Sequence, residues 1–173
     1  MRFIILALVL FIAFFLYGLI SNEPDSDQAL PWMTDYARAL ETAKAEEKPV
    51  LLYFTGSNWC GYCVSLEKRI FSKQAFFDFA NDEVILVYLD FPRGVEQDPA
   101  LENQNYALLD RYQPSIPSLY FIDAQEQILG DTGYISYYVN QGAEAYVNHL
   151  RAVLAEGLAQ KQKQLMLTPA EIE

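Results

Sequence analysis

Two cysteines, Cys60 and Cys63, form a C-x-x-C motif at a junction of predicted elements and are the only cysteines in the 173-residue chain. The apolar run 50–54 before them predicts a buried strand, and residues 64–71 after them carry apolar side chains at helical spacing. This position puts Cys60 at a helix N-terminus, where unpaired N–H groups and the helix dipole favour a thiolate. The thiolate is the nucleophile of thiol–disulfide exchange, and Cys63 is close enough to resolve the mixed disulfide. The pattern therefore predicts a redox site.

Three other interpretations of the two cysteines stay open. A structural disulfide across two intervening residues would close too small a loop to stabilise the fold much. Half of a zinc site would need two further ligands, and the single histidine, His149, lies far along the chain in a predicted helix. Two buried, inert cysteines would not need a position between a strand and a helix. The sequence context favours the redox interpretation.

Two stretches of the chain resemble the thioredoxin superfamily. Residues 45–60 are similar to bacterial thioredoxin-like proteins related to the C-terminal domain of DsbD-type thiol:disulfide interchange reductases. Residues 114–123 match the place where this family has a cis X-Pro bond just before a strand and against the active site, and Pro117 occupies that position. The similarity spans about residues 32–155. It implies an α/β thioredoxin fold, a central mixed sheet with helices on both faces, with Cys60 as the attacking cysteine and Cys63 as the resolving one.

The resemblance also implies roles for the neighbours of the two cysteines. Trp59 is expected to shield the pair, with an ordinary core tryptophan as the alternative. Gly61 and Tyr62 are expected to set the redox poise, because the residues between the cysteines change thiolate stabilisation; they do not decide the direction of electron flow. Ile116, which precedes Pro117, is expected to pair with an extended peptide of the substrate.

One position departs from the family pattern. Thioredoxins usually carry a buried aspartate beneath the second cysteine, and here that place is Tyr53, a poor proton acceptor at neutral pH. Glu67, one helical turn after Cys63, matches a glutamate of DsbD-type domains and is the candidate proton acceptor, with a solvated helix glutamate as the alternative. His149 is expected to be a surface or half-buried helix residue, since no motif places it near the cysteines.

Charge and composition limit the partners. The chain has 23 acidic and 12 basic residues, and its net charge of −11 argues against nucleic acid and anionic membrane surfaces. With 52% hydrophobic and 14% aromatic residues, the chain has enough apolar side chains for the core of one domain. No cofactor and no metal are expected. The expected partners are protein thiols or disulfides and a separate redox protein.

The N-terminal stretch is interpreted as a targeting element. Residues 3–20 carry no charge, Arg2 precedes them, and Glu23, Asp25 and Asp27 follow. The positive-inside tendency then leaves the rest of the chain outside the cytoplasm. The length suits an uncleaved membrane anchor, which we favour, or a signal peptide. We therefore expect the domain on the periplasmic side of the inner membrane, held by a single pass or secreted.

The remaining organisation follows from hydrophobic periodicity and turn residues. Residues 1–21 are assigned to the signal anchor or signal peptide, 22–31 to a linker, 32–163 to the thioredoxin-like domain and 164–173 to a tail. In the first half of the domain we expect a helix at 32–47, a strand at 50–55, a helix at 59–71 capped by Ser57 or Asn58, a helix from a Ser72 cap to Ala80 and a strand at 84–90. An irregular insertion is expected to begin at residue 91. In the second half we expect a helix at 100–112, strands at 119–123 and 127–129 joined by the turn 124–126, a loop at 130–133 and a helix at 141–162.

Taken together, these features predict an extracytoplasmic thiol:disulfide oxidoreductase that reduces protein disulfides through Cys60 and Cys63. The N-terminal segment contains no cysteine, so a separate membrane electron donor is implied. One alternative is a disulfide oxidase or isomerase that an oxidant recharges. The other is a non-catalytic binding module in which the Cys60–Cys63 disulfide is structural.

Overall fold

The computed structural model describes residues 25, 26 and 28–167. In chain order its elements are α2 (Tyr36–Glu46), β1 (Val50–Thr55), α3 (Gly61–Leu66), the π-helix η1 (Glu67–Phe71), α4 (Gln74–Glu83), β2 (Ile85–Asp90), α5 (Pro99–Tyr112), β3 (Ser118–Ile122), β4 (Ile128–Gly133), α6 (Ser136–Gln141) and α7 (Ala143–Leu167).

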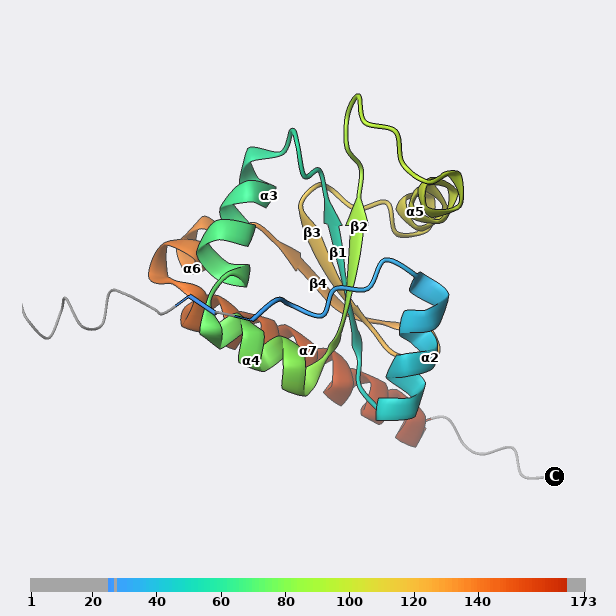
Figure 1. Cartoon of the computed structure of the whole chain (residues 1–173). Coiled ribbons are helices and arrows are strands. Elements are labelled where there is room, and N and C mark those ends of the chain that lie inside the picture. The colour runs from blue at the N-terminus through green and yellow to red at the C-terminus, as the bar shows by residue number, and fades with distance from the viewer. Residues whose placement is uncertain (1–24, 27, 168–173) are drawn as a thin grey trace, which may run out of the picture.

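A four-stranded mixed sheet in the order β2-β1-β3-β4 forms the centre of the molecule (Figure 1). Strand β1 is parallel to β2 and antiparallel to β3, and β3 is antiparallel to β4. The predicted thioredoxin layout, a β-α-β unit followed by a hairpin and a helix, is confirmed. The parallel register pairs Thr55 with Asp90, so β1 and β2 end at the same edge of the sheet. The segments that follow them, 56–60 and 91–98, therefore start next to each other.

Side chains of β1 alternate between two hydrophobic cores. Val50, Leu52 and Phe54 belong to one core and Leu51 and Tyr53 to the other. Figure 1 shows α2 and α5 on one side of the sheet and α3, α4, α6 and α7 on the other. All six residues of β1 are buried because both faces are covered, which explains the uninterrupted apolar sequence of this strand.

The segment before α2 is extended, so the prediction of a helix from residue 32 was wrong at its start. The N–H of Met33 donates to the carbonyl of Leu86, and the N–H of Tyr88 donates to the carbonyl of Met33, both at 2.9 Å. Residues 30–35, which we call the strap, thus lie along the outer edge of β2. Helix α2 begins at Tyr36, where Asp35 caps it by accepting from the N–H of Arg38. Helical spacing alone did not reveal this pairing with a distant strand.

The helix that follows the cysteines does not continue regularly into α4. After α3 the chain widens into the π-helix η1, in which the N–H of Ser72 donates to the carbonyl of Glu67 at 2.9 Å. Ser72 was predicted to cap α4, but it does not, because its hydroxyl donates to the carbonyl of Lys68 at 2.8 Å. The residue before α4 is Lys73, and it makes no side-chain capping bond.

The C-terminal half contains three further differences from the prediction. Strand β4 includes residues 130–133, which were expected to be a loop because of their glycines. Close packing explains Gly133, since a Cβ there would lie 2.8 Å from the carbonyl oxygen of Pro117. Helix α6 was not predicted, and the predicted helix at 141–162 begins only at Ala143, after Gly142, whose φ of 106° is favourable only for glycine. Helix α7 also continues to Leu167, into the predicted tail.

The predicted turn at 124–126 is confirmed. The Asp123 carboxylate accepts from the N–H groups of Gln125 and Gln127, at 2.8 and 2.9 Å, and fixes the turn between β3 and β4.

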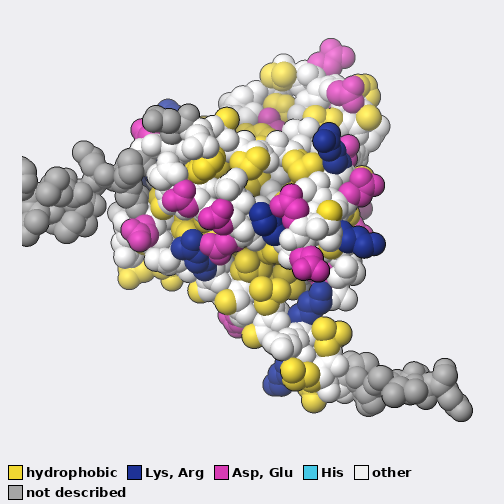
Figure 2. Space-filling view, turned by 60° about the horizontal axis from the view of Figure 1, so that its bottom comes forward, with side chains coloured by type: hydrophobic (Ala, Val, Ile, Leu, Met, Phe, Trp, Pro, Cys, Tyr) yellow, Lys and Arg dark blue, Asp and Glu magenta, His cyan; other side chains and the backbone are white. Residues whose placement is uncertain are grey.

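The targeting prediction for residues 1–21 lies outside the described residues. Within residues 25, 26 and 28–167, no helix is long and apolar enough to cross a membrane. On the face shown in Figure 2, Lys and Arg side chains are interspersed among Asp and Glu side chains. The excess of negative charge is therefore not gathered into a single patch on this face.

Candidate redox site

Cys60 and Cys63 are joined by a disulfide at the N-terminus of α3. Cys60 is itself the N-cap: its backbone is extended, and its Sγ accepts from the N–H of Cys63 at 3.1 Å. The predicted caps, Ser57 and Asn58, are bonded elsewhere. When the pair is reduced, a thiolate on Cys60 would lie at the positive end of the helix with this N–H as a donor. The local structure therefore favours the charged form of Cys60.

The two cysteine residues differ slightly in exposure. Cys60 is 6% exposed, whereas Cys63 is completely buried. Cys60 is thus the less buried of the two, which agrees with the order of attack that the family resemblance implies.

The loop between β1 and α3 is held by β2. The Asp90 carboxylate accepts from the N–H and the hydroxyl of Ser57, at 2.9 and 2.6 Å. The carbonyl of Gly56 accepts from the N–H of Cys60 at 2.9 Å, and a Cβ at this glycine would lie 2.3 Å from the ring of Trp59. The end of β2 and a close contact with Trp59 thus fix the backbone that leads to Cys60.

Trp59 is not a core residue, because it is 37% exposed. Its Nε1–H donates to the carbonyl of Phe91 at 2.7 Å. On the ring lies the guanidinium of Arg93, with its carbon 4.0 Å from the ring centroid. The side chain therefore joins the redox motif to the loop after β2, a contact that the sequence did not indicate.

A groove of about 870 Å³ opens beside the motif, on the side of β3 and β4. Its walls include Tyr62, Ile116 and Pro117, and the Ile116–Pro117 peptide bond is cis, as the resemblance implied. The ring of Tyr62 lies 4.7 Å from that of Tyr134, centroid to centroid. The structure thus brings together the residue between the cysteines and the proline loop.

His149 also lines this groove, although no sequence motif placed it near the cysteines. It is half-buried, as expected. Its Nε2 lies 2.8 Å from the hydroxyl of Thr132, and its ring stacks on Tyr138 at 4.4 Å. Burial lowers the pKa of this imidazole. Packing of α7 against β4 brings His149 to the groove, which could not be read from local periodicity.

A polar cluster lies beneath Cys63 in place of the family's aspartate. Tyr53 is fully buried, and its hydroxyl donates to the carbonyl of Cys63 at 3.4 Å. Tyr88 donates to Oε1 of Glu67 at 3.0 Å. Burial raises the pKa of Glu67, with a smaller contribution from Asp90 in the same direction, while the bond from Tyr88 opposes the shift. Glu67 is therefore not the freely solvated glutamate that was the alternative.

Glu67 is the member of this cluster that can accept a proton. Burial raises the pKa values of Tyr53 and Tyr88, so both hydroxyls remain protonated at neutral pH. The family pattern points to Tyr53 and Glu67 but not to Tyr88, which lies in the middle of a strand with an almost uniformly apolar sequence.

Comparison with known proteins agrees with this geometry. Residues 31–124 match the family model described as thioredoxin-like, which is more than half of the chain. The chain belongs to the thioredoxin-like family. A curated member, disulfide bond reductase DsbH of Chlamydia pneumoniae, is 33% identical over 134 residues, which cover 77% of this chain and 78% of DsbH.

Two solved structures are similar in fold to this thioredoxin-like chain. A DsbH oxidoreductase structure superposes with a TM-score of 0.67 at 31% identity, covering 80% of this chain and 98% of that one. The reduced C-terminal domain of DsbD from Neisseria meningitidis has a TM-score of 0.50 at 20% identity, covering 70% of this chain and 97% of that one, and shows the shared fold alone. Homology to DsbH and the Cys60–Cys63 pair identify the chain as a thiol:disulfide oxidoreductase.

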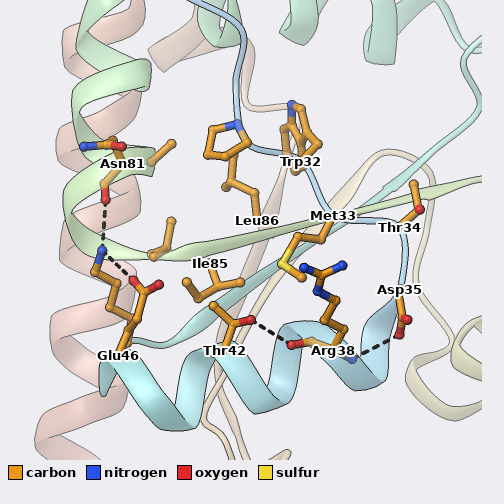
Figure 3. A pocket seen from close by; sticks show the side chains of 14 residues that line it. Trp32, Met33, Thr34, Asp35, Arg38, Thr42, Glu46, Asn81, Ile85 and Leu86 are labelled. Carbon is orange, nitrogen blue, oxygen red and sulfur yellow. Dashed lines mark hydrogen bonds and ion pairs between the residues drawn. The ribbon is translucent and has the colours of Figure 1, made fainter.

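A second hollow in this thioredoxin-like domain lies away from the cysteines. It has a volume of about 590 Å³ and lies between the strap, α2 and α4, with Ile85 and Leu86 in its wall (Figure 3). Figure 3 shows Thr42 and Asp35 bonded to backbone atoms of Arg38 across its floor. Since Ile85 begins β2 and the redox motif lies beyond the end of β1, the two sites are at opposite ends of the sheet.

Proposed function

We propose that this chain reduces disulfide bonds of proteins outside the cytoplasm. The observation that carries the proposal is the cysteine pair itself: Cys60 caps α3 through its sulfur and is the more accessible of the two, and Cys63 lies behind it. The similarity to DsbH, which is named a disulfide bond reductase, supports reduction as the direction.

The reaction transfers two electrons in two exchanges. The Cys60 thiolate attacks one sulfur of the substrate disulfide, forms a mixed disulfide and releases the first substrate thiolate. Cys63, once deprotonated, attacks Sγ of Cys60, releases the second substrate thiolate and closes the Cys60–Cys63 disulfide. The two substrate thiolates take up protons, and a dithiol donor protein must then return two electrons to the pair.

We assign proton acceptance from Cys63 to Glu67. Tyr53 occupies the place of the usual aspartate, and its raised pKa keeps it a donor. Glu67 is half-buried one helical turn after Cys63, whose carbonyl accepts from its N–H, and burial raises the pKa of its carboxyl, which makes the carboxylate a better base than an ordinary glutamate. Tyr88 holds the carboxylate by donating to Oε1.

The remaining roles rest on the family resemblance. Ile116 and Pro117 would bind the substrate backbone along the groove beside Tyr62, and Trp59 and Gly61 would shape access to Cys60. Residues 1–21 would anchor the chain in the inner membrane by a single pass, with the domain on the periplasmic side and a membrane electron donor as its partner.

Reduction of insulin tests the proposal. The full-length chain in non-ionic detergent should accelerate the precipitation of insulin B chains by dithiothreitol, and the Cys60→Ser variant should not. Equal rates for the two proteins would show a binding module with a structural disulfide. A chain that instead oxidises reduced peptides faster than it reduces insulin would be an oxidase.

A further inference from the structure

The loop at 91–98 is fixed against the redox motif at several points. The N–H of Phe91 donates to the carbonyl of Thr55 at 3.0 Å and its carbonyl accepts from Trp59. Asn58 and Arg93 form a reciprocal pair: Nδ2 of Asn58 donates to the carbonyl of Arg93 at 2.9 Å, and the N–H of Arg93 donates to Oδ1 of Asn58 at 3.0 Å. Figure 1 shows this loop rising beyond the end of β2 at the same end of the molecule as α3. The loop is therefore a wall of the redox site.

Arg93 places a positive charge on this wall. The carbon of its guanidinium lies 4.0 Å from the centroid of the ring of Trp59, the residue next to Cys60. Arg93 is exposed, so N–H groups of its guanidinium are available, and their fork matches the two oxygens of a carboxylate. Among the described residues, Arg93 forms no ion pair. The nearest acids along the chain are Asp90, which binds Ser57, and Glu96 in the same loop.

We propose that Arg93 selects substrates that carry an acidic side chain close to the disulfide. The inference rests on the proposed reductase function and names the substrate class of the same site. The mixed disulfide on Cys60 brings the neighbouring residues of the substrate next to Trp59, where a carboxylate would meet the guanidinium. The preference is local, because the net charge of −11 would by itself favour cationic substrates.

Three peptide disulfides that differ only in the residue beside cysteine, Glu, Gln or Lys, provide the test. Stopped-flow mixing with the reduced full-length chain measures the rate constant of the first exchange for each. We expect the Glu peptide to react about two- to fivefold faster than the Lys peptide, the range for one exposed charge pair, and the ratio to fall at high salt. In Arg93→Glu the order should reverse, and in Arg93→Lys the ratio should be reduced but kept.

Two further variants separate the local effect from general ones. Lys44→Glu makes the same change in net charge on α2, at the other end of β1, and should leave the Glu-to-Lys ratio unchanged. Asn58→Ala keeps Arg93 but removes both hydrogen bonds that fix its backbone, so the ratio should shrink.

The Gln peptide distinguishes the two proposals. If the reduced chain fails to react with this peptide, the reductase function itself is refuted. If the chain reacts but Arg93→Glu leaves the Glu-to-Lys ratio as in the wild type, or Lys44→Glu shifts it equally, Arg93 does not select the substrate. Each variant's rate with the Gln peptide also reports whether its redox site is intact.

Discussion

At the residue scale, one side chain performs two tasks. The sulfur of Cys60 takes the place of the oxygen that usually caps a helix and is also the accessible end of the disulfide. Capping by an anion at a helix N-terminus is favourable, so the fold itself stabilises the nucleophile. The complete burial of Cys63 fits the resolving role that we propose for it.

Trapping of substrates tests the order of the two cysteines. In Cys63→Ser the first exchange proceeds and the second cannot, so mixed disulfides with extracytoplasmic proteins should accumulate on non-reducing gels. Cys60→Ser should give none, because the remaining thiol is buried. Adducts formed only by Cys60→Ser would mean that the roles are reversed.

The Glu67→Gln variant tests the proton acceptor. Attack by Cys60 should keep its rate, while release of the second substrate thiol should slow by up to about 10²-fold, the low end for general-base catalysis, because the carboxylate is only half-buried. Stopped-flow exchange with a peptide disulfide resolves the two steps. If the rate of the second step were unchanged, the proton acceptor would be water or the substrate and not Glu67.

The same variant has a predicted pH signature in stability. Because the pKa of Glu67 is raised in the folded state, its favourable contribution is complete below the ordinary value of 4.5 and is lost as pH rises through the folded-state pKa. Glutamine stays neutral and still accepts from Tyr88. Thermal unfolding should therefore show equal stability in acid and a more stable variant at neutral pH. A difference that does not change with pH would contradict the burial argument.

At the element scale, the strap and β2 explain much of how the site is supported. Trp32 of the strap lies 5.8 Å from the ring of Tyr53 and 5.6 Å from that of Tyr88, centroid to centroid, and thus packs under the polar cluster. It also contacts Phe71 at the end of η1. The strap, which was not predicted to pair with the sheet, therefore packs against residues that support the helix carrying the cysteines.

Replacement of Trp32 tests this role of the strap. Trp32→Ala should lower the free energy of unfolding by about 2–3 kcal/mol, somewhat less than the roughly 3–5 kcal/mol of a fully buried aromatic residue. Urea unfolding monitored by circular dichroism gives the value. Tyr137→Ala, which removes a ring that is 67% exposed, is the control and should change stability little. Equal losses in the two variants would show that the strap does not support the core.

The elements that were predicted correctly are those defined by residues close together in the sequence. The apolar runs that became β1 and β2 and the cysteine motif were found in this way, whereas the cis bond before Pro117 was implied by the family resemblance. The strap was misassigned because Trp32 and Tyr36 share a helical spacing, while the partner that keeps Met33 extended lies in another strand. Tyr88 and Arg93 were missed for a similar reason: each acquires its meaning from a contact with a distant segment.

At the scale of the whole molecule, the environment of the disulfide determines how strongly a thiolate on Cys60 is stabilised. Within the described part of the chain, Sγ of Cys60 accepts one hydrogen bond, from the N–H of Cys63. Gly61 and Tyr62 add no positive charge between the cysteines. Since stronger stabilisation of the thiolate makes a pair more oxidising, the reduction potential reports how strongly this environment stabilises a thiolate on Cys60.

The reduction potential measures this balance. Equilibration of the full-length chain with dithiothreitol buffers should give a value closer to the roughly −270 mV of thioredoxin than to the roughly −120 mV of a strong oxidant. Cys60→Ser, which cannot form the disulfide, provides the baseline signal. A value near that of the oxidant would favour the oxidase alternative and would count against a membrane electron donor as partner.

The position of the strap affects how the edge of the sheet can pair with other polypeptide chains. A bare strand at the margin of a sheet offers unpaired N–H and C=O groups to any extended polypeptide, and such pairing leads to aggregation. Met33 occupies part of this margin on β2 from within the same chain. Because part of this margin is already paired within the chain, fewer backbone groups of β2 are free to pair with a strand of another polypeptide.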